Sequence, residues 1–271
     1  MTTHDSTDGI RLVTATFALL VSLAGCGPAD GGGNNDGTTN QDFDEIRSSK
    51  ERISNPSVSQ SKLEKLTRDN ADFAFDLYDE LAAEKSGENF FYSPHSISSA
   101  LAMTYAGAEG SSESQMKSAL HFTQPEKDLH PAFNKLDLTL EKRAEQTGDS
   151  DDGSPFKLEV ANSVWGQKNY PFKQPFLDTL AKHYGAGLRG LNFQEKPNQS
   201  RKTINDWVEK QTENKIKDLL PEGSITPLTR MVLTNAIYFK ASWAHKFDKS
   251  KTKKAQFATA SGNSVQVDMM S

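Results

Sequence analysis

Apolar positions along the chain recur with two different spacings, and these spacings predict its helices and strands. Phe73, Leu77 and Leu81 repeat every four residues, which is typical of a helix with one buried face. By the same pattern, helices are predicted at residues 69–83, 94–106, 112–120, 128–145, 175–184 and 203–220. Short alternating or continuous apolar runs predict strands at residues 89–92, 156–167, 188–193, 231–239, 256–259 and 264–269. Helices dominate the earlier part and strands the later part, and this order predicts an α+β fold.

Two apolar segments carry no charged side chain and are expected to be buried. The first, residues 89–107, reads NFFYSPHSISSALAMTYAG; Ser93 suits the N-cap of a helix, Pro94 its first position and Gly107 its end. A helix without a charged side has no face suited to water, so its small residues predict close packing against neighbours. The second segment, residues 231–239, reads MVLTNAIYF and predicts a central strand that is covered on both faces.

The N-terminal residues resemble an export signal. Residues 12–24 form an apolar run of the length found in signal peptides, and it leads into Gly25 and Cys26. The ending Leu-Ala-Gly-Cys resembles the lipobox of prokaryotic lipoproteins, in which cleavage leaves a lipid-bearing cysteine at the new N-terminus. Cys26 is the only cysteine of the chain, and lipidation would account for an unpaired thiol in an exported protein. An ordinary secretory signal with an incidental cysteine is the alternative.

Gly, Asn, Asp, Ser and Thr dominate the residues after Cys26, up to about residue 60, and predict a flexible tether. The predicted organisation is a lipoprotein signal peptide at residues 1–25, a low-complexity tether at residues 26–62 and a folded domain at residues 63–271. Such a protein is expected to be exported, and to be held at the cell surface by its lipid or to reside in the extracellular space.

Charge and motif content exclude several classes of function. The chain has 31 Lys and Arg against 36 Asp and Glu, and no basic patch interleaves with aromatic residues, so nucleic acid is not an expected partner. The six histidines are dispersed, and neither G-x-S-x-G nor H-E-x-x-H occurs. We therefore expect no catalytic residue, no metal and no cofactor, although scattered Ser, His and Asp leave a hydrolase formally open.

One glycine motif matches a nucleotide-binding pattern by its letters alone. Residues 185–190 read GAGLRG, which fits G-x-G-x-x-G. A dinucleotide loop must leave a strand and open a helix, so that the helix N-terminus meets the phosphates. Here a predicted helix precedes the glycines and a predicted strand follows them. The glycines are therefore expected to end a helix and form a tight turn.

Four segments of the chain, taken in order, resemble motifs of the serpin family of protease inhibitors. Residues 89–97 resemble N-x-x-x-S-P-x-S-I, and residues 158–165 resemble the second strand of sheet A. Residues 204–219 resemble helix F, and residues 233–247 resemble the third strand of sheet A and its continuation. The motif residues matched are Asn89, Pro94, Leu101, Gly107, Asn162, Trp165, Ile204, Asn205, Phe239 and Phe247. The match runs from about Leu66 to Ser271.

This resemblance implies a fold of three β-sheets with a belt of helices, and inhibition of a serine (or cysteine) protease. In such inhibitors the protease cleaves an exposed reactive loop, is acylated, and is displaced as the loop inserts into sheet A as an extra strand. Ser93, Ser96 and Asn235 would belong to the shutter, where sheet A parts, and Trp243 to the breach, where the loop enters first. These roles are mechanical, and ordinary core packing is the alternative for each residue.

The resemblance also implies parts that these 271 residues do not contain. A serpin domain continues through the rest of sheets B and C, the fifth strand of sheet A and the reactive loop. We therefore expect an N-terminal portion of a longer lipoprotein serpin, from a truncated reading frame or an incomplete sequence, that is non-inhibitory as written. Without the fifth strand, residues 231–239 should form an open apolar edge. A non-inhibitory binding or structural protein on the same scaffold is the alternative, and bulky or charged hinge residues would favour it.

Overall fold

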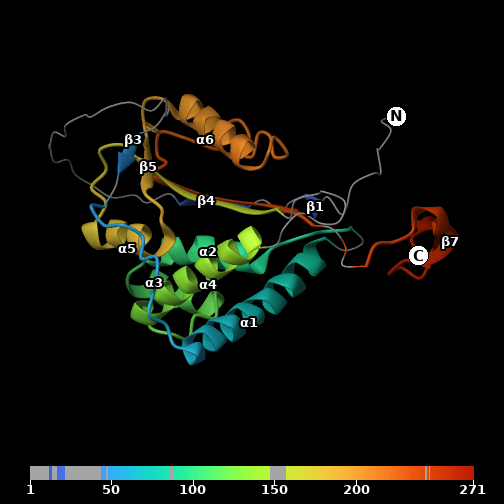
Figure 1. Ribbon diagram of the computed structural model, residues 1–271. Coiled ribbons are helices and arrows are strands. Elements are labelled where there is room, and N and C mark those ends of the chain that lie inside the picture. The colour runs from blue at the N-terminus through green and yellow to red at the C-terminus, as the bar shows by residue number, and fades with distance from the viewer. Residues whose placement is uncertain are drawn as a thin grey trace.

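The computed structural model describes residues 12–13, 17–21, 44–46, 48–85, 88–146, 157–241, 243 and 245–271. Its main sheet has the strand order β1-β6-β4-β5-β3, with β2 also paired to β6, and β7 and β8 form a separate hairpin (Figure 1). The strands are β1 (Leu12–Val13), β2 (Phe17–Val21), β3 (Asp44–Ile46), β4 (Lys157–Gln167), β5 (Leu188–Leu191), β6 (Met231–Lys240), β7 (Lys253–Ala258) and β8 (Ser264–Met269).

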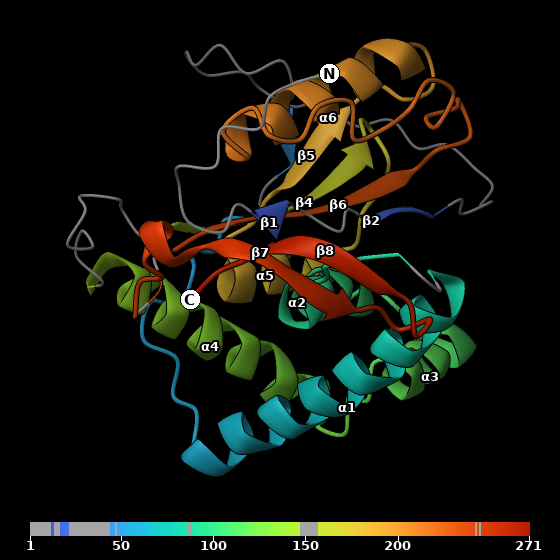
Figure 2. The same ribbon diagram turned by 90° about the vertical axis from the view of Figure 1, so that its right-hand side faces the viewer.

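Helices cover both faces of the main sheet. Helix α6 lies on one face, and the other helices lie beneath the opposite face, with α1 and α3 farthest from the sheet (Figures 1 and 2). The helices are α1 (Gln60–Glu84), α2 (Pro94–Tyr105), α3 (Gly110–Ala119), α4 (Glu126–Gln146), α5 (Gln174–Tyr184) and α6 (Pro197–Gln211), with a short 3-10 turn at Lys249–Lys251. The α+β prediction is confirmed.

Strand β6 is buried on both faces, as its unbroken apolar sequence predicts. Val232 and Ala236 belong to the core that lies between the sheet and Val208 of α6. Met231 and Leu233 alternate with them and join the core formed with α2 and α5 on the opposite face. Because successive side chains of a strand point to opposite faces, a strand covered by helices on both sides needs apolar residues at nearly every position.

Helix α2 is the buried helix that its uncharged sequence predicts. The hydroxyl of Ser93 accepts a hydrogen bond from the backbone N–H of Ser96 at 3.4 Å, and Pro94 occupies the first turn. Seven of its twelve residues are buried, which leaves no room for a solvated charged face. Past its end, a Cβ at Gly107 would meet the ring of Phe176 at 3.1 Å. A side chain at this position would therefore push α2 and α5 apart.

The predicted open edge of β6 is wrong in this structure. Residues 17–21 of β2 pair antiparallel with residues 231–235, and residues 12 and 13 of β1 pair with Phe239 and Tyr238. These residues belong to the apolar run predicted to be a signal peptide. An apolar strand satisfies the backbone groups that a bare edge would leave open. Cys26 and the remainder of residues 22–43 lie outside the described residues. Within the described part of the chain, no helix is long and apolar enough to cross a membrane.

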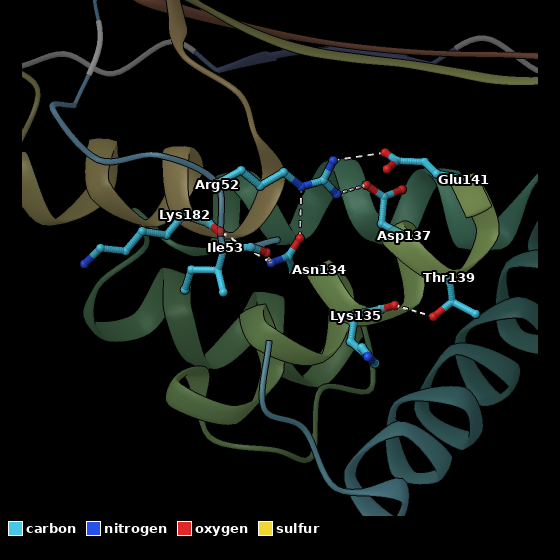
Figure 3. A network of polar contacts seen from close by, with 8 residues as sticks. All are labelled: Arg52, Ile53, Asn134, Lys135, Asp137, Thr139, Glu141 and Lys182. Atoms are coloured by element: carbon cyan, nitrogen blue, oxygen red, sulfur yellow. Dashed lines mark hydrogen bonds and ion pairs between the residues drawn. The ribbon is translucent and has the colours of Figure 1, made fainter. Parts of the chain in front are cut away.

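Part of the predicted tether packs against the folded domain. Strand β3 pairs with β5, and the guanidinium of Arg52 contacts three side chains of α4 (Figure 3). Arg52 Nε donates to Asn134 at 3.0 Å, Nη1 to Glu141 at 3.0 Å, and Nη2 to Asp137. Helix α1 already begins at residue 60. Packed structure therefore starts well before residue 63.

Three other predictions differ from the structure. Residues 89–92 are irregular instead of a strand, and Tyr92 bonds to the backbone of α1 through its hydroxyl. Helix α3 starts at Gly110, two residues before the predicted start at residue 112. Helix α6 spans residues 197–211 instead of 203–220, because Asn214 and its predecessor adopt left-handed backbone conformations that a helix cannot continue through.

Candidate functional site

The structure joins α2, β4 and β6 through one amide side chain. The Nδ2 of Asn235, on β6, donates hydrogen bonds to the hydroxyl of Ser96 on α2 and to the side-chain oxygen of Asn162 on β4. Asn162 and Asn235 are directly paired in the antiparallel register, which places their side chains on the same face of the sheet. The Nδ2 of Asn162 in turn donates to the backbone carbonyl of Ser96 at 3.4 Å. We call Ser96, Asn162 and Asn235 the shutter junction.

Two of the three residues of the shutter junction are buried, and their polar groups depend on one another. Ser96 is fully buried and Asn235 is 3% exposed. A buried amide or hydroxyl that loses its partner costs about 1–3 kcal/mol, so the strands cannot shift past α2 without breaking several bonds together. Ser93 stands one turn away and holds the helix start that presents Ser96 to the sheet. The structure thus brings Ser96 and Asn235 together with Asn162, whereas the shutter role of these residues stays a prediction.

The opposite face of the sheet carries a second set of polar and aromatic contacts. Trp165 of β4 is fully buried and donates its indole N–H to the hydroxyl of Thr234 at 3.1 Å. Its ring meets Trp207 of α6 edge-on at 5.5 Å. The guanidinium of Arg189 lies 4.8 Å from the Trp207 ring centre and 5.5 Å from that of Trp165, and its Nε donates to Ser163 at 2.9 Å. These contacts tie α6 to β4 and β5 by cation–π and hydrogen-bond interactions.

Asn205, a matched motif residue, anchors the segment that follows α6. Its side-chain oxygen accepts from the backbone N–H of Leu220 at 2.8 Å, and its Nδ2 donates to the Leu220 carbonyl at 3.0 Å. Ile204, beside it, is fully buried in the core between α6 and the sheet. An irregular segment that is buried must find partners for its backbone, and one asparagine satisfies both groups of Leu220.

The remaining predicted residues lie outside the shutter junction. Trp243 and Phe247 follow the end of β6, are 47% and 40% exposed, and stack edge-on at 5.5 Å. Leu101 is half-buried between the two cores that flank α2, and Phe239 is the last but one residue of β6. Asn89 is exposed in the irregular stretch before α2. The breach role of Trp243 therefore stays a prediction.

The described residues also bear on metal ligands and on the glycine motif. Among the described residues, no group of three or more His, Cys, Asp or Glu side chains could hold a metal ion. The glycine motif at residue 185 is a helix C-cap, because Gly185 has a left-handed φ of 60° and ends α5. A Cβ there would also meet the Arg52 side chain at 2.8 Å. The motif therefore serves packing.

Sequence reasoning missed the residues whose partners are distant in the chain. The cation–π contact between Arg189 and Trp207 cannot be read from the sequence, because it depends on β5 and α6 both packing against β4. The composition around Arg52 predicts a flexible tether and gives no sign of its contacts with α4. The one available signal was at Asn162, since an asparagine inside an apolar strand predicts a buried partner for its amide.

Comparisons with known proteins agree with this geometry. Residues 68–271 match the family described as Serpin (serine protease inhibitor). An uncharacterized serpin-like protein of Methanosarcina mazei is 41% identical over 203 residues, covering 74% of this chain and 46% of the relative. The leukocyte elastase inhibitor of Equus caballus is 40% identical over 208 residues, covering 77% of this chain and 52% of the relative. The chain therefore spans about half the length of the curated relatives it matches.

A solved structure shares the arrangement of helices and strands described above. The serpin AtSerpin1 of Arabidopsis, in its native stressed conformation, superposes with a TM-score of 0.64 at 30% identity. The superposition covers 79% of this chain and 53% of that one. The sequence motifs, the buried shutter junction and the overall architecture all indicate the same protein family. The chain belongs to the serpin family, whose members are mostly protease inhibitors and not enzymes.

Proposed function

We propose that this chain is the shutter-bearing N-terminal portion of a serpin-type inhibitor of a serine (or cysteine) protease. The observation that supports this most strongly is the shutter junction, in which Asn235 bonds to Ser96 and Asn162 at once. In the proposed mechanism a protease cleaves the reactive loop and is acylated, and the loop then inserts into the main sheet and carries the enzyme with it.

The shutter junction suits a sheet that must open in one step. Both N–H bonds of the Asn235 amide are committed, one to α2 and one to β4. A partial shift of the strands would leave buried donors and acceptors without partners, so intermediate positions are disfavoured. The sheet would stay closed until the free energy released by loop insertion exceeds the free energy needed to break these hydrogen bonds. Ala100 of α2, which lies in the core shared with β4 and β6, presents only a methyl group to a sheet that moves over it.

On this proposal, the 271 residues alone do not trap a protease. The match covers 46% of one relative and 52% of another, and we take the family's reactive loop to lie outside the matched part. Inhibition would belong to a protein that continues through that loop. The chain's own contribution would be the fixed side of the opening sheet, with Ser93, Ser96 and Asn235 holding it closed and Trp243 near the loop's point of entry.

We also propose that the protein is exported and anchored through Cys26, in which case cleavage before Cys26 removes β1 and β2 from their positions beside β6. The support is the sequence alone: an apolar run, small residues before the cysteine, and no second cysteine. Metabolic labelling with palmitate in a bacterial expression host would detect the lipid. The label should be lost in Cys26→Ser. Labelling that persists in this variant would contradict lipid attachment at Cys26.

The inhibitory function is tested by mixing protein with protease and analysing the products on a denaturing gel. The 271-residue chain and a version extended through the reactive loop are each incubated with a serine protease such as leukocyte elastase. The extended protein should form a complex that survives SDS, whereas the 271-residue chain should not. A complex formed by the shorter chain, or simple cleavage of the extended protein without a complex, would contradict the proposal.

A further inference from the structure

The long outer edge of β6 is occupied by residues from the N-terminal end of the chain. Residues 12 and 13 of β1 and residues 17–21 of β2 pair with this edge antiparallel, and both strands lie beside β6 in Figure 2. The other edge of β6 pairs with β4, and the far side of the sheet ends in β3, which has three residues. Within the described sheet, a further strand as long as the ten residues of β6 would therefore find partners only where β1 and β2 now lie.

This N-terminal segment fills the edge less completely than a continuous strand would. Strand β4 pairs with β6 at ten consecutive positions. On the outer edge, Val13 is opposite Tyr238. Phe17 is opposite Asn235, so three residues of the segment correspond to two residues of β6 and the register shifts by one. Because an extra residue in one strand interrupts the hydrogen-bond ladder, a strand of unbroken register would make more backbone hydrogen bonds to β6 than this segment makes.

The segment competes for this edge with the advantage of belonging to the same chain. Residues 12–21 read LVTATFALLV, which contains no charged residue, Gly or Pro and includes five residues that favour strands. A strand that is covalently linked to its partner acts at an effective concentration that reaches the millimolar range for short flexible links, whereas a separate strand acts only at its actual concentration. Hydrolysis of the peptide bond between Gly25 and Cys26, the cleavage proposed above, would remove this advantage.

We propose that residues 12–21 act as an internal blocking segment, and that their release converts the edge of β6 into a binding site for an extended, uncharged peptide strand. Main-chain hydrogen bonds would supply the affinity, as they do when a peptide adds a strand to the edge of a sheet. In the inhibitor proposed above, the strand that takes this place would be the cleaved reactive loop of the extended protein. The uncleaved precursor could then not insert its loop, and export would activate it. This consequence rests on the proposed function, whereas the exchange of strands does not.

Strand exchange is tested with a fluorescein-labelled peptide of sequence LVTATFALLV, which carries added lysines for solubility. The recognition sequence of a site-specific protease is inserted after Gly33 of the full chain, in the predicted tether, so that the folded protein can be cut there without losing a residue. Fluorescence anisotropy gives the dissociation constant of the peptide before and after cutting. The cut protein should bind the peptide tighter by about tenfold or more, because the blocking segment is no longer linked to β6.

A matched peptide separates strand pairing from general apolar attraction. N-methylation at the positions of Leu19 and Leu20 leaves every side chain unchanged but removes two adjacent N–H donors, one of which faces β6 in either register. This peptide should bind the cut protein more weakly by about tenfold or more. Equal binding of the two peptides, equal binding to cut and uncut protein, or no binding to the cut protein would each overturn the proposal.

Paired substitutions in the uncut chain provide an independent test. Leu19→Pro together with Leu20→Pro removes the same donors from the blocking segment, so this chain should bind the unmodified peptide about tenfold more tightly than the parent does. Thr2→Pro together with Thr3→Pro, outside the paired residues, is the control and should bind as the parent does. Parent-like binding in the first variant would contradict the proposal, and if that variant does not fold, the comparison of cut and uncut protein decides.

The peptide measurements involve no protease and no reactive loop. Failure of the extended protein to trap a protease would therefore leave them unaffected, so the two proposals fail separately. If both proposals hold, the extended protein should form its SDS-resistant complex only after it has been cut in the tether.

Discussion

The side-chain amide of Asn235, near the middle of β6, donates a hydrogen bond to the hydroxyl of Ser96, 139 residues earlier on α2. The same amide group also donates to Asn162 on the neighbouring strand β4. One side chain therefore couples a buried helix to two strands. The proposed role of these residues in holding the sheet closed depends on this pair of hydrogen bonds.

Replacing Asn235 with Ala should reduce the free energy of unfolding by about 2–4 kcal/mol. The substitution removes two hydrogen bonds and leaves buried acceptors on Ser96 and Asn162 without donors. Urea unfolding measures the loss. The double variant with Ser96→Ala should show a coupling energy of about 1–2 kcal/mol. Asn263→Ala in the exposed β7–β8 turn is the control and should change stability by less than about 0.5 kcal/mol. Additive effects at positions 96 and 235 would show that the bond does not matter.

Replacing Arg189 with Ala should loosen α6 from the sheet. The guanidinium loses its contacts with two indole rings and its bond to Ser163, a cost of about 1–3 kcal/mol. Limited proteolysis should then cleave within residues 197–211 faster than in the parent. Arg189→Lys keeps the charge but not the planar group, so it should fall between Ala and the parent. Equal cleavage rates in all three proteins would show that Arg189 does not hold α6 on the sheet.

Removing residues 1–25 should expose the edge of β6. In the structure β1 and β2 pair with that edge, and an unpaired apolar edge is a site for intermolecular pairing. Analytical ultracentrifugation should show more self-association for residues 26–271 than for the full chain at the same concentration. Deletion of residues 1–11 alone, which leaves both strands in place, is the control. If both shortened chains remain equally monomeric, the pairing has no protective effect.

Acidification should destabilise the helical layer through His130. This histidine is 4% exposed, and burial, together with the nearby His183, lowers its pKa to about 3. The unfolded chain has the ordinary histidine pKa near 6.5, so it binds the proton more readily than the folded chain. Stability is therefore complete above pH 6.5 and is lost as the pH falls from 6.5 toward 3. At pH 5 the loss from His130 amounts to about 2 kcal/mol.

Melting curves at pH 7 and pH 5 measure this effect. The difference in melting temperature between the two should shrink in His130→Gln, which retains a polar group for Tyr184 but does not titrate. His245→Gln, at an exposed position, should keep the full difference. His95 and His183 are shifted in the same direction by burial, so some pH dependence remains in either variant. If His130→Gln keeps the full difference in melting temperature between pH 7 and pH 5, a group other than His130 causes the acid destabilisation.

Local signals were sufficient for the elements whose ends are set by their own residues. Ser93 and Pro94 start α2, Gly185 ends α5, and the apolar run of β6 lies at the centre of the sheet. In these cases capping geometry, backbone preference and hydrophobic burial all act within a few residues. The family resemblance assigned Ser96 and Asn235 to one region, and the hydrogen bond between them became visible only in the structure.

Predictions failed where tertiary contacts decided the conformation. Ile216 and Leu220 have helical spacing, yet they reach the core from an irregular segment that Asn205 holds in place. The aromatic residues before α2 have high strand propensity, but within the described structure no strand pairs with them. Arg52 follows a polar stretch, and its three partners on α4 become visible only once the fold brings them together.

The most direct test of the account is the stoichiometry of inhibition of the protein extended through its reactive loop, measured for the parent and for Ser96→Phe. The parent should consume about one molecule per protease trapped, because the sheet opens and accepts the loop faster than the acyl bond is hydrolysed. In Ser96→Phe the added ring would fill the shutter junction, so the protein should polymerise or be cleaved as a substrate, with a stoichiometry severalfold higher. Equal stoichiometry and equal melting temperature in the two proteins would contradict the claim that Ser96, Asn162 and Asn235 control the opening of the sheet.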